Sequence, residues 1–398
     1  EALNYLGGIL GITFVEVTET DTAVGDIRFT LFNGAENETG YSGMAYPGDY
    51  GYDQVINSSV ILDILIDASN NLDADGNPDF SKGSYGYNTI LHEIGHVLGL
   101  GHGHEGESTQ YWNYGPEGDV LQETLYFESL DELGYKSYGW QGWTVMDYRE
   151  YEGHSHANLS SEHPAATIIK ITETGKNFYA TTFMPLDISA ALYLYGWWDD
   201  EGIYMLNPVN SGDDTYVLEG PFFETIHDTG GTDTLDWSAT SDNTQVNLNP
   251  FSLSYFGENK LTIEDGSGQV DSVGWLLGIS EFTYIENVKA GSGNDTIILN
   301  NVANMVQAGD GNDIIVGIDS GDNVYGEGGN DYFSVSSFDF SLIDGGAGTN
   351  YFTSPQQYLD NGLLSVDFRD IPAGKISNIT FLDYRSTNDE GQILISEQ

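Results

Sequence analysis

The sequence predicts a chain of two parts, an α+β N-terminal part and an all-β C-terminal part. Strand-like segments come first and lead to one strongly helical segment at 88–100. Beyond Gly196 the texture changes to Gly, Asp, Asn and Thr with short β-branched runs, and we find no long helical pattern there. Asp295, Asp313 and Asp331 recur every 18 residues, which indicates a structural repeat.

The N-terminal elements follow from hydrophobic periodicity. Alternating apolar and polar residues predict half-buried strands, and the continuous apolar run at 60–66 predicts a buried strand. The expected order is the tail of a helix at 1–12, strands at 13–18 and 27–32, an edge strand at 41–47, the strand at 60–66, and helices at 88–100 and 186–195. We place the domain boundary near 185. Residues 1–185, expected to be incomplete at the N-terminus, form one domain, and 186–398 form the other.

Composition excludes several classes of protein. The chain has 11 Lys and Arg against 62 Asp and Glu, a net charge of −51, which excludes a nucleic-acid-binding surface and disfavours an anionic membrane. It has no cysteine, so disulfides and thiolate ligands are excluded, and no apolar run long enough for a membrane span. A Cys-free, acidic chain with 50 glycines suits a secreted calcium-binding protein, but a surface adapted to high salt explains the acidity equally well.

The repeat predicts a calcium-binding parallel β-roll. Gly-rich, Asp-containing copies match the nonapeptide G-G-x-G-x-D-x-U-x, in which glycines permit the turn and the aspartate and carbonyls offer oxygen ligands. Ile297, Ile315 and Phe333 then point into a thin core. The candidate calcium-binding residues are Gly291, Gly293, Asp295, Gly309, Gly311, Asp313, Asp322, Gly326, Gly328 and Asp331.

One stretch predicts a catalytic zinc site. His92, Glu93, His96, Gly99 and His102 fit H-E-x-x-H-x-x-G-x-x-H without a mismatch. Residues i and i+4 share a helix face, and a positive φ at the glycine turns the chain so that the third histidine reaches the same ion. Three imidazoles leave one position of a tetrahedral zinc open for water. The glutamate is then placed to act as general base, and peptide hydrolysis is the expected chemistry.

A second signature lies 44 residues after His102. Met146 is followed by Asp147 and Tyr148, and a methionine on a tight turn below a three-histidine zinc site is the second mark of the metzincins. The Tyr148 hydroxyl can reach the zinc or the tetrahedral intermediate.

Together these motifs resemble the serralysin family of secreted bacterial zinc metalloendopeptidases. Further similarity lies at Met184–Ala191, Leu194–Gly196 and Asp228–Thr234. The resemblance implies a metzincin-like α+β protease domain followed by an all-β RTX β-roll. It implies one zinc on the three histidines, Glu93 as base, Tyr148 as an extra ligand that stabilises the transition state, and several calcium ions. It also implies further calcium-binding residues and a substrate-binding edge strand: Asp228, Gly230, Gly231 and Asp233 for the former, Gly43, Met44, Ala45 and Tyr46 for the latter.

The resemblance predicts a protein secreted by a type I exporter of a Gram-negative bacterium. Its expected partners are protein or peptide substrates, with a proteinaceous inhibitor as a candidate. We expect a monomer that binds no nucleic acid and has no membrane span. The alternative is a calcium-dependent surface or matrix protein with a vestigial zinc site. His104, His154, His156 and His163 are interpreted as polar loop residues, with a second metal or substrate role left open.

Overall fold

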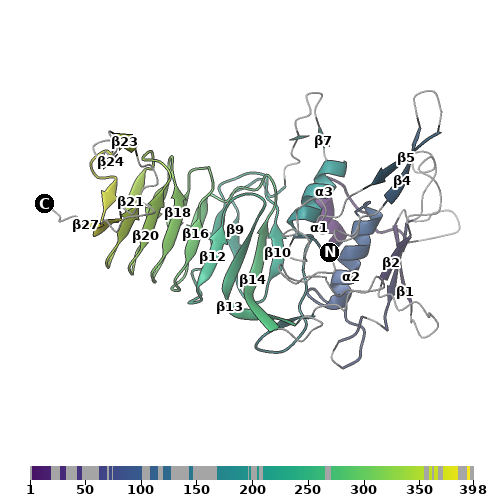
Figure 1. Ribbon diagram of the computed structural model, residues 1–398. Helices are drawn as coiled ribbons and strands as arrows, with labels where there is room; N and C mark the ends of the chain where they lie inside the picture. The colour runs from purple at the N-terminus through teal and green to yellow at the C-terminus, as the bar shows by residue number, and fades with distance from the viewer. Residues whose placement is uncertain are drawn as a thin grey trace. The chain divides into compact units, whose positions relative to one another are not determined.

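The computed structural model divides the chain into two compact units (Figure 1). The first comprises residues 1–207, 223–225 and 261–272, and the second comprises 208–222, 226–260 and 273–398. The structure describes residues 2–18, 27–32, 43–46, 62–69, 71–73, 75–100, 108–114, 120–126, 143–146, 168–195, 197–198, 204–205, 209–264, 270–353, 358–360, 363–365, 371–383 and 392–394.

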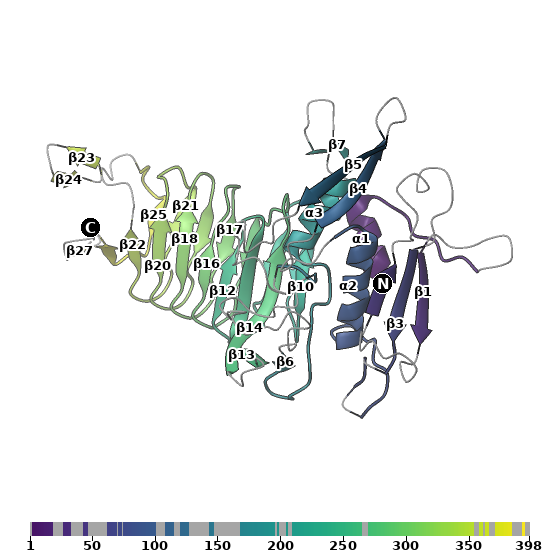
Figure 2. The same ribbon diagram turned by 45° about the vertical axis from the view of Figure 1, so that its right-hand side comes forward.

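The first unit contains the helices and a three-stranded sheet. The helices are α1 (Ala2–Leu10), α2 (Tyr85–Val97) and α3 (Pro185–Tyr195). The strands are β1 (Ile27–Phe32), β2 (Gly43–Tyr46), β3 (Leu62–Asp67), β4 (Ser108–Tyr114), β5 (Val120–Tyr126), β6 (Ile168–Ile171), β7 (Trp197–Trp198) and β8 (Tyr204–Met205). The sheet order is β1-β3-β2, with β1 parallel and β2 antiparallel to β3, and α2 packs beside β2 and β3 (Figures 1 and 2). Strands β4 and β5 form a separate hairpin, as do β7 and β8.

Most of the elements expected in this unit are present. The strand expected at 41–47 is β2, an edge of the described sheet, and the helix expected at 186–195 is α3. The strand expected at 13–18 is wrong: no strand is assigned there, and Val15 and Val17 are 73% and 53% exposed. Alternation predicts which side of a strand would be buried, but a strand forms only where a neighbouring backbone accepts its hydrogen bonds.

Helix α2 has clear signals at both ends. Ser84 is its N-cap, and the Ser84 side chain accepts a hydrogen bond from the Tyr87 N–H at 3.1 Å. Leu91 and Ile94 are at most 1% exposed and anchor the apolar face. Gly99 has a φ of +86°, a left-handed conformation that ends the helix and redirects the chain. The helix is therefore held at both ends and along one face.

The described part of the second unit consists of strands. These are β9 (Thr215–Val217), β10 (Phe223–Ile226, of which 223–225 belong to the first unit), β11 (Thr234–Asp236), β12 (Thr244–Asn247), β13 (Ser252–Glu264, of which 261–264 belong to the first unit), β14 (Val270–Ile279, of which 270–272 belong to the first unit), β15 (Asn287–Lys289), β16 (Thr296–Ile298), β17 (Met305–Gln307), β18 (Ile314–Ile318), β19 (Asn323–Tyr325), β20 (Tyr332–Val335), β21 (Leu342–Asp344), β22 (Tyr351–Thr353), β23 (Tyr358–Asp360), β24 (Leu363–Ser365), β25 (Ile376–Ser377), β26 (Phe381–Asp383) and β27 (Gln392–Leu394).

From β15 to β22, successive strands alternate between two sheets, in each of which they pair in parallel (Figure 2). One sheet runs β10-β14-β13-β12-β16-β18-β20-β22-β26-β27, with β13 antiparallel to β12 and β27 antiparallel to β26. The other runs β9-β11-β15-β17-β19-β21-β25. Ile297, Ile315 and Phe333 lie in register on neighbouring strands and are 0% exposed, as the repeat predicted. Val306 and Val324, on the other sheet, are also 0% exposed. The core of the roll therefore consists of the central residues of these short strands, contributed by both sheets.

Glycines let the turns of this coil stack closely. Gly311 and Gly329 have φ values of +127° and +137°, a backbone conformation that residues with a side chain rarely adopt. A Cβ on Gly311 would overlap the carbonyl oxygen of Gly293, and a Cβ on Gly329 would overlap that of Gly311.

Among the described residues, no helix is long and apolar enough to cross a membrane.

Helix α3 belongs to the first unit, whereas the sequence analysis placed residues 186–195 in the second domain. The Tyr195 hydroxyl donates to the Leu98 carbonyl at 2.8 Å, and so α3 is tied to the end of α2. This contact joins segments 97 residues apart, and hydrophobic texture does not reveal it.

Candidate metal centres

Helix α2 brings His92 and His96 together. Their Nε2 atoms lie 3.1 Å apart, and their rings meet edge to face. Two nitrogens bound to one tetrahedral zinc, each about 2.0–2.1 Å from it, lie roughly 3.3 Å apart. The separation of the two Nε2 atoms is therefore close to that of two ligands on a single zinc ion.

Backbone carbonyls fix the tautomers of both rings. His92 Nδ1 lies 2.8 Å from the Val145 carbonyl oxygen, and His96 Nδ1 lies 2.9 Å from the Leu100 carbonyl oxygen. A carbonyl only accepts, so each Nδ1 donates and each neutral ring presents a lone pair at Nε2. Two lone pairs that face each other at 3.1 Å repel unless a cation or a proton lies between them. The two histidines therefore fit a zinc ion with its usual carbonyl support.

The side chain of Glu93, a residue of α2, lies against the edge strand β2. Its side chain is buried, which raises the pKa of the carboxyl to about 7, although a hydrogen bond from the Ala45 N–H opposes that rise. Gly43 permits the close approach, because a Cβ there would be 2.7 Å from Thr89 Cγ2 and 2.8 Å from Glu93 Oε1. The strand expected to bind substrate thus lies directly against the expected base.

The turn at 143–146 lies against the same helix. Val145 supplies the carbonyl for His92, and Met146 is 2% exposed. A Cβ on Gly95 would overlap the Met146 sulfur, so the helix and the turn are in close contact at this glycine. Met146 therefore packs directly against the histidine helix.

Asp187, near the start of α3, holds this turn in place. Its carboxylate accepts from Thr144 Oγ1 at 2.5 Å, from the Val145 N–H at 2.8 Å and from the Met184 N–H at 3.0 Å. Burial outweighs these donors and raises the pKa of Asp187 to about 6. Asp187 lies in the similar segment Met184–Ala191, but its sequence position indicates no role, because an acidic residue in a first helical turn is ordinary.

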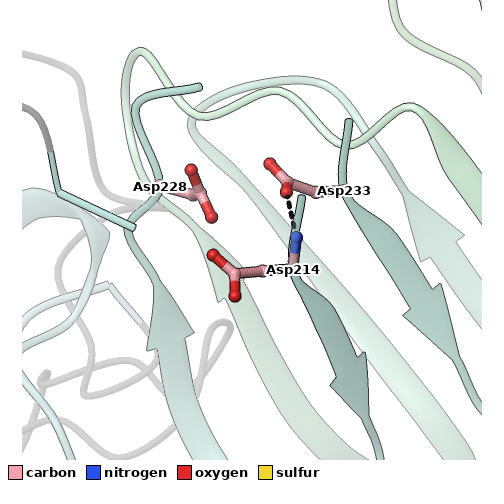
Figure 3. Close-up of side chains that lie close together, drawn as sticks. All are labelled: Asp214, Asp228 and Asp233. Carbon is pink, nitrogen blue, oxygen red and sulfur yellow. Dashed lines mark hydrogen bonds between the residues drawn. The ribbon is translucent and has the colours of Figure 1, made fainter. Parts of the chain in front are cut away.

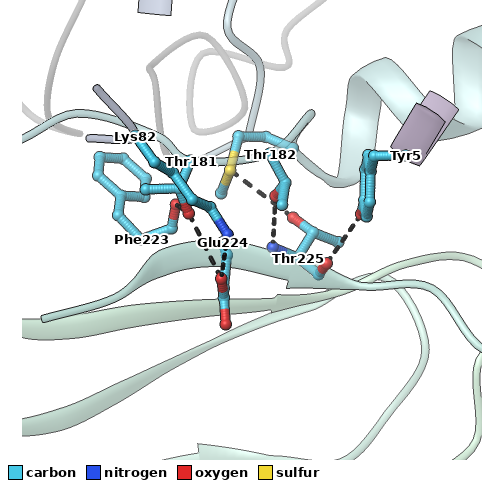
Figure 4. A network of polar contacts seen from close by, with 8 residues as sticks. Tyr5, Lys82, Thr181, Thr182, Phe223, Glu224 and Thr225 are labelled. Atoms are coloured by element: carbon cyan, nitrogen blue, oxygen red, sulfur yellow. Dashed lines mark hydrogen bonds and ion pairs between the residues drawn. The ribbon is translucent and has the colours of Figure 1, made fainter. Parts of the chain in front are cut away.

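A polar network, drawn in Figure 4, connects the segment before α3 with strand β10. The Thr225 N–H donates to Thr182 Oγ1 at 2.8 Å, and the Tyr5 hydroxyl donates to the Thr225 carbonyl at 2.9 Å. Lys82 and Glu224 form an ion pair at 3.5 Å. These bonds fix the chain that leads into Met184 and Asp187.

Several expected site residues lie outside the described residues. They are His102, Tyr148, His104, His154, His156 and His163. The third zinc ligand and the tyrosine therefore stay predictions.

The candidate calcium-binding aspartates are buried in the turns of the second unit. Asp295, Asp313, Asp322 and Asp331 are at most 1% exposed. Burial is the main cause that raises the pKa of Asp313 to about 8 and those of Asp322 and Asp331 to about 6. Buried carboxylates of this kind are suited to a hard divalent cation, which would stabilise their ionised form.

A second acidic cluster lies at the start of this unit (Figure 3). Asp214, Asp228 and Asp233 place carboxylate oxygens within 4.8 Å of one another. The Asp214 N–H donates to Asp233 Oδ1 at 2.8 Å, and the Gly230 N–H donates to Asp228 Oδ1 at 3.0 Å. Burial raises the pKa of Asp233 to about 6.

The sequence analysis included Asp228, Gly230, Gly231 and Asp233 but missed Asp214. A signal was present, because Asp214-Thr215-Tyr216 shares the pattern Asp-Thr-apolar with Asp233-Thr234-Leu235 and Asp295-Thr296-Ile297. Gly231 has a φ of +129°, and a Cβ there would overlap the Gly212 carbonyl oxygen.

Comparison with known proteins gives one consistent class. The chain is 29% identical over 231 residues to metalloprotease AprA of Pseudomonas entomophila (strain L48), covering 56% of this chain and 39% of that protein. It is 28% identical over 311 residues to metallopeptidase AprA of Pseudomonas marginalis, covering 77% and 54%. It is 30% identical over 239 residues to serralysin of Photorhabdus luminescens, covering 57% and 39%.

The chain is therefore similar in sequence to the serralysin-type metalloproteases. These alignments span 39% to 54% of the lengths of the curated relatives. No protein-family model matches the chain.

Proposed function

We propose that this chain is a secreted zinc-dependent metalloendopeptidase of the serralysin type that hydrolyses peptide bonds of extracellular proteins. The observation that carries the proposal is the Nε2 separation of 3.1 Å between His92 and His96, with both Nδ1 atoms held by carbonyls. Its relatives are named metalloproteases, metallopeptidases and serralysins, which supports the same class of enzyme.

His92, His96 and His102 would hold the zinc. A bound zinc supplies Lewis-acid polarisation of the scissile carbonyl and acidifies the attacking water. Glu93 takes a proton from that water and passes it to the nitrogen of the leaving amine as the peptide bond breaks. A pKa near 7 suits both transfers, because the group both accepts and returns a proton near neutral pH. The Tyr148 hydroxyl would donate a hydrogen bond to the oxyanion.

Strand β2 is the proposed substrate-binding element, through Gly43, Met44, Ala45 and Tyr46. It is an edge of the described sheet, and an extended peptide would add to it by main-chain hydrogen bonds. The contact of Ala45 and Gly43 with Glu93 would bring the scissile bond next to the base. Main-chain recognition favours broad sequence tolerance.

The second unit is proposed to be an RTX β-roll that needs calcium to fold. Its in-register parallel strands and buried aspartates support this assignment. Metal-binding free energy is folding free energy, so such a roll stays unfolded at cytosolic calcium and folds outside the cell. This agrees with export by a type I system, and we propose that the folded protein is a monomer.

The test is hydrolysis of casein by the full chain and by Glu93→Gln, with zinc content measured on both. The proposal predicts one zinc per chain in both proteins and a loss of about 10²–10⁴-fold in rate for the variant. Glu16→Gln, at an exposed residue, is the control and keeps full activity. A folded, zinc-loaded wild type that cleaves no peptide would favour the alternative, a calcium-dependent surface or matrix protein.

A further inference from the structure

Four side chains form a row along one edge of the second unit. Asp295, Asp313, Asp331 and Asn350 are at most 1% exposed, and they follow one another at intervals of 18, 18 and 19 residues. The N–H of each of the first three donates to Oδ1 of the next residue, at 2.8, 3.0 and 2.9 Å. Oδ1 therefore has the same role in the last three residues. The members of the row differ mainly in the surroundings and chemistry of the second terminal atom of each side chain.

The two middle residues carry a buried oxygen without a donor. Asp313 Oδ2 and Asp331 Oδ2 are inaccessible and have no hydrogen-bond partner. The Gly345 carbonyl oxygen, another acceptor, is near Asp331 Oδ2. A Cβ on Gly326 would overlap Asp331 Oδ2 and lie 2.8 Å from that carbonyl oxygen. A buried anionic oxygen without a donor is strongly unfavourable, so an ionised carboxylate at either of these two positions needs a cation beside it.

The first member of the row is already satisfied by the protein. Asp295 Oδ2 accepts from the indole Nε1–H of Trp237 at 3.2 Å. Asp295 Oδ1 accepts from the N–H and the hydroxyl of Thr244, at 2.9 and 2.8 Å. Both oxygens have donors, and so no ion is needed to compensate them.

The last member of the row carries a donor of its own. Asn350 Oδ1 accepts from Asp331, as an aspartate oxygen would, but the other terminal atom is an amide nitrogen. That nitrogen donates to the Gly345 carbonyl at 2.8 Å and to the Asn378 carbonyl at 3.0 Å. The carbonyls that could otherwise ligate a cation thus receive hydrogen bonds instead.

We propose that calcium on this edge is required beside Asp313 and Asp331 only, and that Trp237 and Asn350 replace it at the two ends. The inference rests on the proposed function of the second unit as a calcium-binding roll. It assigns to Trp237 and Asn350 the role of bounding the row of ions. Both ends of the row are then satisfied without calcium.

The test is the number of calcium ions bound by the full chain, measured by native mass spectrometry and by equilibrium dialysis with calcium alone. We expect Asn350→Asp to bind one more calcium than the wild type and Asp331→Asn to bind one fewer. Asp339→Asn, which removes one exposed charge from the same unit, is the control and binds the wild-type number. In chelator, Asn350→Asp should also melt below the wild type, because its new carboxylate would face the Gly345 and Asn378 carbonyls, and calcium should restore its melting temperature.

The outcomes separate this inference from the function beneath it. A wild type that binds no calcium contradicts the proposed calcium-binding roll itself. A wild type that binds calcium, with an unchanged number in both Asn350→Asp and Asp331→Asn, overturns the inference alone. If Asn350→Asp does not fold even with calcium, the count for Asp331→Asn decides, because that near-isosteric change removes the oxygen that has no donor.

Discussion

The sulfur of Met146 lies in the space that a Cβ on Gly95 would occupy. Gly95 is the residue before His96 on α2, and Met146 follows the residue whose carbonyl binds His92. A missing side chain thus lets the histidine helix and the supporting turn meet. The contact has a direct consequence for the zinc site.

Gly95→Ala should weaken both stability and zinc binding. The added methyl group must displace the Met146 side chain, and overpacking of this kind destabilises by about 1–3 kcal/mol. Thermal melting and competition for zinc with a chelator measure the two effects. Gly8→Ala is the control, because nothing lies within 4 Å of its Cβ position and alanine favours the helix. If Gly95→Ala melts and binds zinc as the wild type does, the contact has no role in the site.

Asp187→Asn should bind zinc about tenfold more weakly, as expected for a change in the shell around a metal ligand. The carboxylate orders Thr144 and Val145, and the Val145 carbonyl orients His92. An amide would direct N–H groups toward donors that need an acceptor. Asp75→Asn, at an exposed residue, is the matched control. Equal zinc affinity for Asp187→Asn and the wild type would show that the turn is held without this carboxylate.

The same carboxyl predicts a pH dependence. Its folded pKa is about 6, above the ordinary 3.8, so the folded state favours the proton. The stability that this group contributes is fully present below pH 3.8 and is lost as pH rises through 6. The melting temperature of the wild type minus that of Asp187→Asn should therefore fall between about pH 4 and pH 7. A difference that rises over this range contradicts the assigned shift.

Removal of calcium should unfold the second unit of the intact protein. We expect chelator to reduce the β signal in circular dichroism and calcium to restore it, because buried Asp313 and Asp331 lack donors for one oxygen each. Magnesium at the same concentration is the control, since it fits such flexible oxygen sites poorly. Spectra that do not change with calcium would refute the coupling of calcium binding to folding.

Local patterns predicted the elements that depend on local sequence. The periodicity at 88–100 indicated α2, and the repeat indicated that Ile297, Ile315 and Phe333 are buried in register. The four-residue spacing of His92 and His96 was sufficient to predict that they share a helix face. These predictions were confirmed because the helix period and the repeat period can be counted directly along the sequence.

Long-range polar contacts were not predictable in the same way. Two of the three donors to Asp187 lie 42 and 43 residues earlier, and no spacing rule links them to it. The alternation at 13–18 failed because pairing depends on a neighbouring strand. Asn350 stands at the aspartate position of a further nonapeptide copy, which begins at Gly345, but that match does not reveal its role, since the role depends on the carbonyls of Gly345 and Asn378.

X-ray absorption at the zinc edge of the loaded full chain tests the central claim most directly. We expect three imidazole nitrogens at about 2.0–2.1 Å from the zinc in the wild type and two in His102→Ala. Fewer than three imidazoles in the wild type, or an unchanged spectrum in His102→Ala, would contradict a zinc site built from His92, His96 and His102.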